Sequence, residues 1–92
     1  MGSLSDLPNV GRVLEGNLIA VGVTTPEQLR ELGAKEAFLR IRSQVDPGAC
    51  IRLLYGIQGA VDGVPDTQLP AAVKQDLRAF LAGLEGAGQT GV

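Results

Sequence analysis

The sequence predicts an all-α fold, a compact bundle of about five short helices. Apolar residues recur at helical spacing through most of the chain, most clearly over residues 50–61 and 73–84. No alternating pattern of apolar and polar residues is long enough to indicate a strand. The 92 residues are 45% apolar, which suffices for one aliphatic core without a metal or a disulfide.

The first long helix is expected to run from Val10 to Val21 and to stop at Gly22. Leu14 and Leu18 would form its inner face together with Val21. The next segment, residues 25–28 (TPEQ), matches a capping box with proline at the first helical position. The pattern therefore predicts a second, short helix directly after the first.

A break at Gly33 separates the short helix from a third one, whose apolar stripe is Ala34, Ala37, Phe38 and Ile41. The pair Asp46-Pro47 is typical of an N-cap and first turn and predicts the start of a fourth helix. The stripe of that helix would be Cys50, Leu53, Leu54, Ile57 and Val61, ending at Gly63. Cys50 is accordingly expected to be a small buried hydrophobe.

Gly56 and Gly59 are expected on the back of the fourth helix, near Arg52. Each weakens a helix by about 1 kcal/mol relative to alanine, so their presence indicates close approach of another backbone. The neighbour would be a helix of the same chain or a partner, and internal packing is the favoured interpretation.

Pro70 suits the first turn of a fifth helix, with the stripe Val73, Leu77, Phe80, Leu81 and Leu84. The expected organisation is a leader over residues 1–6, a helical domain over 7–84 and a flexible tail over 85–92.

The composition offers no catalytic chemistry. The chain has no histidine and a single cysteine, and its acidic residues are scattered over caps and polar faces. Asp62 and Asp66 are best interpreted as a solvated turn. We therefore expect no catalytic residues, no cofactor and no metal site. The sequence has no transmembrane run or secretory signal, so we expect no membrane contact and a cytoplasmic location.

The net charge is −2, whereas proteins that bind nucleic acid non-specifically are usually basic. Basic residues outnumber acidic ones only between residues 30 and 52. Contact with phosphate would therefore depend on one local face, for which the candidates are Arg12, Lys35, Arg40 and Arg42.

The segment LPNVG, residues 7–11, allows two interpretations. A tight glycine turn before a helix leaves backbone N–H groups that can bind phosphate, with Gly11 giving close approach and Arg12 the charge. Alternatively, Asn9 caps these N–H groups itself, and the turn only starts a helix. The candidate contact residues of the turn are Asn9, Val10, Gly11 and Arg12.

Three stretches carry a family resemblance: LPNVGRVLEGNLIAVGVTTPEQLRELGAKEAFLRI, CIRLLYGIQGAVDG and LPAAVKQDLRAFL. Over roughly residues 4 to 84 the sequence resembles the C-terminal domain of the TfoX/Sxy family, bacterial regulators of natural competence and transformation. The resemblance implies a helix-hairpin-helix or SAM-like arrangement. It also implies a turn like that in the C-terminal domain of the α chain of RNA polymerase, a domain that contacts the DNA backbone. Family members often carry a further N-terminal domain, which residues 1–6 cannot contain.

The leading hypothesis is a non-enzymatic regulatory module that contacts another protein. The alternative is a non-specific DNA-binding domain that uses the LPNVG turn and a local basic face. Self-association as a homodimer is a third hypothesis, because Ile19, Leu39 and Ile51 lie outside the predicted stripes.

Overall fold

The computed structural model describes residues 3–90 and the side chains of residues 3–85, and within these ranges the fold is all-helical without strands. Five α-helices and two short 3-10 helices follow one another: η1 (Leu4–Asp6), α1 (Arg12–Ala20), α2 (Pro26–Leu32), α3 (Ala34–Gln44), α4 (Ile51–Asp62), η2 (Asp66–Gln68) and α5 (Ala71–Thr90). The radius of gyration is 12.9 Å, close to the roughly 12 Å of a compact domain of this length. The predicted fold class is confirmed.

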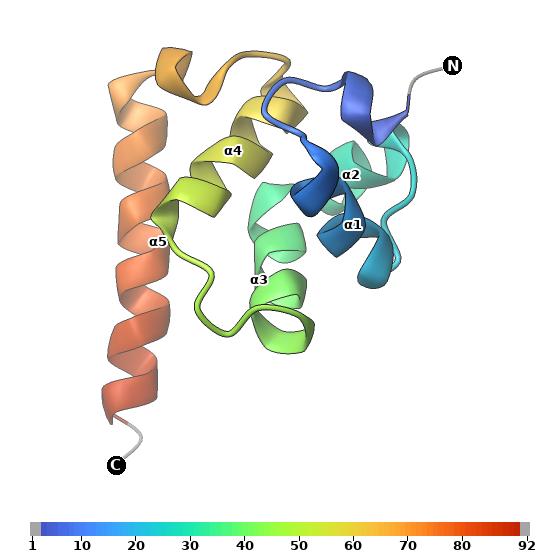
Figure 1. The fold of residues 1–92 in the computed structure, drawn as a ribbon. Coiled ribbons are helices and arrows are strands. Elements are labelled where there is room, and N and C mark those ends of the chain that lie inside the picture. The colour runs from blue at the N-terminus through green and yellow to red at the C-terminus, as the bar shows by residue number, and fades with distance from the viewer. Residues whose placement is uncertain (1–2, 91–92) are drawn as a thin grey trace.

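The helix α4 lies at the centre of the fold, where it packs against α2, α3, α5 and η2 (Figure 1). The long helix α5 runs along one side of the bundle and extends past the end of α3, whereas α1 and α2 lie on the opposite side. This arrangement brings the start of α1 close to α4, although the two are far apart in the sequence.

The core is aliphatic, as the composition indicates, and Phe38 of α3 is its largest fully buried side chain. The other fully buried large side chains come from every α-helix, from η1 and from the segment between α1 and α2: Leu4, Leu18, Val23, Leu29, Ile41, Leu54, Ile57 and Leu77. Leu4 is only 1% exposed, so the packed core includes a side chain from the segment expected to be a leader.

Three of the predicted helix ends are confirmed, namely the start of α2 and the ends of α2 and α4. Thr25 caps α2, because its Oγ1 accepts a hydrogen bond from the backbone N–H of Gln28 at 3.1 Å. The Gln28 side chain turns back to Thr24, accepting from its N–H at 2.7 Å and from its hydroxyl at 2.9 Å. Gly33 and Gly63 end α2 and α4 with positive φ angles of 87° and 77°, which glycine adopts without a Cβ penalty.

The predicted start of the fourth helix is wrong. Asp46 closes a turn instead, because its Oδ1 accepts from the Gly48 N–H at 3.0 Å and its carbonyl accepts from the Ala49 N–H at 3.0 Å. The helix α4 begins at Ile51, after Cys50 in extended conformation. Cys50 is therefore the N-cap residue and is exposed, which corrects the expectation of a buried cysteine.

Three other ends also differ from the prediction. The helix α1 begins at Arg12 instead of Val10 because Gly11 has an extended backbone, with φ −95° and ψ −171°, and is the N-cap residue. Pro70 precedes α5, and its carbonyl accepts from the Lys74 N–H at 3.0 Å. At the other end, α5 continues to Thr90, within the segment expected to be a tail; residues 91–92 lie outside the described residues, as do residues 1–2.

Candidate functional site

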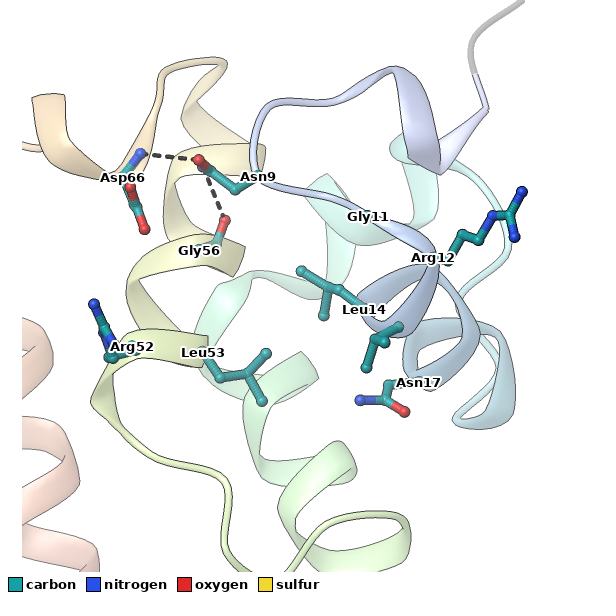
Figure 2. A pocket seen from close by; sticks show the side chains of 10 residues that line it. Asn9, Gly11, Arg12, Leu14, Asn17, Arg52, Leu53, Gly56 and Asp66 are labelled. Carbon is teal, nitrogen blue, oxygen red and sulfur yellow. Dashed lines mark hydrogen bonds between the residues drawn. The ribbon is translucent and has the colours of Figure 1, made fainter.

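The turn before α1 is held by the side chain of Asn9. Its Nδ2 donates to the carbonyl of Gly56 at 3.3 Å and to that of Val64 at 3.1 Å. Its Oδ1 accepts from the backbone N–H of Asp66 at 3.0 Å (Figure 2). Asparagine tolerates the left-handed conformation found here better than most residues. Asn9 therefore connects the N-terminal turn to α4 and to the segment that follows it.

Because these three bonds occupy Asn9, the interpretation that it caps the first helix is wrong. Gly11 is the N-cap residue of α1, and no side chain caps the first-turn N–H groups of that helix. The side chain that sequence reasoning assigned to capping the first helix thus makes tertiary contacts more than 45 residues away along the chain.

The two glycines of α4 allow the turn that contains Asn9 to lie close against this helix. Gly56 and Gly59 are buried, not on an exposed back face, because the turn of Asn9 covers them. A Cβ on Gly59 would lie 2.5 Å from Asn9 Nδ2 and 2.6 Å from the Val64 carbonyl oxygen. A Cβ on Gly56 would meet only the Asn9 Cβ, at 3.8 Å. Internal packing, the favoured interpretation of these glycines, is what the structure shows.

Between α1 and α4 this packing leaves a hollow of about 400 Å³, which we call the α1–α4 hollow. Its wall is mainly apolar, with Val13 and Leu14 on α1 and Leu53 on α4. In Figure 2 the side chains of Leu53 and Asn17 come toward the hollow from opposite helices. Val13 is 79% exposed, which is unusual for a residue that continues a helical apolar face.

A smaller hollow of about 180 Å³ lies next to the first one, between α4, η2 and the start of α5. We call it the Tyr55 pocket; it is lined by Arg52, Tyr55, Asp66, Thr67 and Lys74. Arg52 and Asp66 line both hollows, so the two lie side by side.

Two cations are placed around the Tyr55 ring. Lys74 Nζ lies 5.9 Å from the ring centroid, and Arg78 donates from Nη1 to the Tyr55 hydroxyl at 2.9 Å. Both residues belong to α5, whereas Tyr55 belongs to α4. The contacts therefore join the two helices and hold positive charge at this edge of the fold.

The four predicted residues of the turn lie together, but they differ in what they offer. Val10 is buried in the core, and Asn9 is occupied by its three hydrogen bonds. Gly11 and Arg12 are exposed and line the α1–α4 hollow. The guanidinium of Arg12 extends outward, away from Leu53 and Arg52 (Figure 2).

The remaining predicted cations lie elsewhere and do not join Arg12 at this hollow. Lys35 pairs with Asp76 of α5 at 2.8 Å and lies 5.3 Å from the Phe80 ring centroid. Arg40 pairs with Glu36 one turn earlier in α3, at 3.4 Å. Arg42 lines a separate hollow near the end of α3, and its buried Nη1 has no hydrogen-bond partner among the described residues.

Sequence reasoning missed Arg52 and Lys74, which line the Tyr55 pocket, and Arg78, which donates to the Tyr55 hydroxyl. The sequence indicates these cations only weakly, because each is an isolated basic residue on the polar side of a predicted helix. Only the packing of α4 against α5 brings them to one edge, and a helical pattern carries no information about that packing.

The described residues contain no group of three or more acidic or cysteine side chains that could hold a metal ion. Among residues 3–90, no helix is both long and apolar enough to cross a membrane.

Comparisons with known proteins agree with this architecture. Residues 1–81 match the family model of the TfoX C-terminal domain. The chain is 39% identical over 74 residues to Protein Sxy of Escherichia coli (strain K12), covering 80% of this chain and 35% of that protein. It therefore spans about a third of the length of this curated relative.

Two crystal structures from Listeria monocytogenes are also similar. An uncharacterized protein in a triclinic form has a TM-score of 0.89 at 46% identity, covering 92% of this chain and 96% of that one. A protein of unknown function in a tetragonal form has a TM-score of 0.84 at 46% identity, covering 88% of this chain and 98% of that one.

Proposed function

Because this chain belongs to the TfoX C-terminal domain family, we propose that it is a non-enzymatic regulatory module of the competence-regulator type that acts by contacting another protein. The proposed contact surface is the α1–α4 hollow. It is formed where the N-terminal turn packs on α4, so its shape depends on the clamp made by Asn9.

The observation that carries this proposal is the exposed side chain of Val13 at the edge of an apolar hollow. Val13 is 79% exposed although it lies beside Leu14 and Leu53 at a concave surface. Single exposed apolar residues are normal, whereas an apolar side chain at the edge of an apolar hollow is typical of a site that a partner covers. An apolar anchor placed in such a hollow would be largely desolvated, as interface hot spots are.

The test is a pull-down from cells of the native host, with the partner identified and its affinity then measured. Val13→Ser should weaken binding about three- to tenfold, because it removes apolar contact area without touching the core. Ile19→Ser is the matched control: Ile19 is on the same helix and 50% exposed, but it does not line the hollow. If both variants bind the partner like the parent chain, the hollow is not the contact surface.

DNA-backbone binding is the second candidate function, favoured by the uncapped first turn of α1 and the exposed Arg12 beside it. It receives less support from Lys35 and Arg40, which are engaged in ion pairs. Titration of the chain with duplex DNA at two salt concentrations tests it. A DNA-binding domain should lose affinity and about one unit of salt slope on Arg12→Glu. Absence of binding at low salt would exclude it.

A further inference from the structure

We infer that the α1–α4 hollow and the Tyr55 pocket together bind a protein segment that carries carboxylates next to an apolar anchor residue. This inference rests on the proposed function and adds the chemistry of the partner. The anchor would occupy the α1–α4 hollow, and the carboxylates would lie along the Tyr55 pocket.

The first step is that the two hollows are neighbours on the surface. Arg52 and Asp66 line both, so a peptide segment longer than a single residue could contact the two hollows at once. The surface thus has an apolar end of about 400 Å³ and a charged end of about 180 Å³. In Figure 2, Leu53 lies at the apolar α1–α4 hollow, and Arg52 lies on the side of this hollow that faces α5.

The second step is the charge at the smaller end. Arg52 and Lys74 line this pocket, and Arg78 donates to the Tyr55 hydroxyl. Within the part of the chain that the structure describes, none of these three cations makes an ion pair. Asp66 is the acidic residue of the pocket, and no ion pair joins it to Arg52. This edge therefore has an excess of positive charge in a chain whose net charge is −2.

The third step is that these cations are held in place. Lys74 lies over the Tyr55 ring and Arg78 donates to its hydroxyl, so both side chains converge on one aromatic residue. Cations restrained in this way lose less conformational entropy when a carboxylate binds than freely rotating ones do. Charges on helices are also positioned more rigidly than charges on loops.

The apolar α1–α4 hollow and the cations near Tyr55 together favour an acidic protein segment over nucleic acid. Phosphate backbone could pair with the cations, but it has no apolar side chain to place against Val13, Leu14 and Leu53. A peptide with an aliphatic or aromatic anchor and flanking glutamates or aspartates complements both ends.

The experiment selects peptides from a random phage-displayed library on the immobilised full chain. Enriched peptides are then synthesised and their affinities measured. We expect enrichment of sequences with an apolar residue flanked by acidic ones. Their binding should be about five- to tenfold weaker to Arg52→Glu, because an attractive contact becomes a repulsive one, and weaker at high salt.

Arg30→Glu is the matched control, since Arg30 is an exposed arginine on α2 that lines neither hollow. It makes the same change in net charge and should leave peptide binding unchanged. Equal loss in both variants would mean that only the overall charge matters and would overturn the inference. Enrichment of basic or uncharged peptides, or no enrichment at all, would also overturn it.

The result separates the inference from the proposed function. If the native partner binds in a Val13-dependent manner but is unaffected by Arg52→Glu, the module contacts a protein whose chemistry is not acidic, and only the inference fails. If duplex DNA binds while neither peptides nor a native protein do, both fail.

Discussion

At the scale of single residues, Asn9 has a structural role that its exposure does not indicate. It is exposed by area, yet its amide makes three hydrogen bonds to backbone groups on α4 and in the segment after it. An exposed asparagine in a turn ordinarily indicates a local cap. Here the same side chain fixes how the N-terminal turn sits on α4, and with it the shape of the α1–α4 hollow.

Removing the Asn9 side chain should therefore destabilise the fold. Asn9→Gly keeps the left-handed backbone accessible but loses the three bonds, for an expected cost of about 2 kcal/mol in the free energy of unfolding. Asn9→Ala adds strain at positive φ and should cost about 1 kcal/mol more. Urea unfolding measures both.

Asn17→Ala serves as the control for these variants. Asn17 lies in α1 and lines the hollow, but it makes no hydrogen bond through its side chain to another described residue. Its replacement should leave stability within about 0.5 kcal/mol of the parent chain. An Asn9→Gly chain as stable as Asn17→Ala would show that the clamp contributes nothing.

At the scale of elements, α4 is the helix on which the site is built. Its position in the sequence and its end at Gly63 follow from the apolar pattern. Its start at Ile51 and the burial of Gly56 and Gly59 do not follow from that pattern. The start depends on the local hydrogen bonds of the Asp46 turn, and the burial depends on tertiary contact with Asn9. Helical periodicity reports which face is apolar, but not which glycine lies under another segment.

The two glycines of α4 should respond in opposite ways to the same change. Gly56→Ala adds a methyl group at ordinary contact distance and should stabilise the chain by up to about 1 kcal/mol through helix propensity. Gly59→Ala places its Cβ against the clamped amide of Asn9 and a backbone carbonyl. It should destabilise the chain by about 1–2 kcal/mol despite the gain in propensity. Thermal or urea unfolding of the pair decides this, and equal shifts in both would contradict the packing described.

At the scale of the whole molecule, the amino-acid pattern predicts the fold class and nearly all of the helices, because each helix carries its own apolar stripe. It predicts the proposed contact surface only in part. Gly11 and Arg12 do line the hollow, whereas Lys35 and Arg40 lie elsewhere and are paired. Arg52, Lys74 and Arg78 converge only because α4 packs on α5, and such inter-helix proximity is not encoded in any single segment.

The measurement that tests the central claim most directly is site-specific photo-crosslinking in living cells of the native host. A benzoylphenylalanine is placed at position 13, beside the α1–α4 hollow, or at position 30 on α2, away from it. The account predicts a discrete protein adduct from position 13 that is absent from position 30. Adducts of equal yield from both positions, or an adduct with DNA in place of protein, would contradict it.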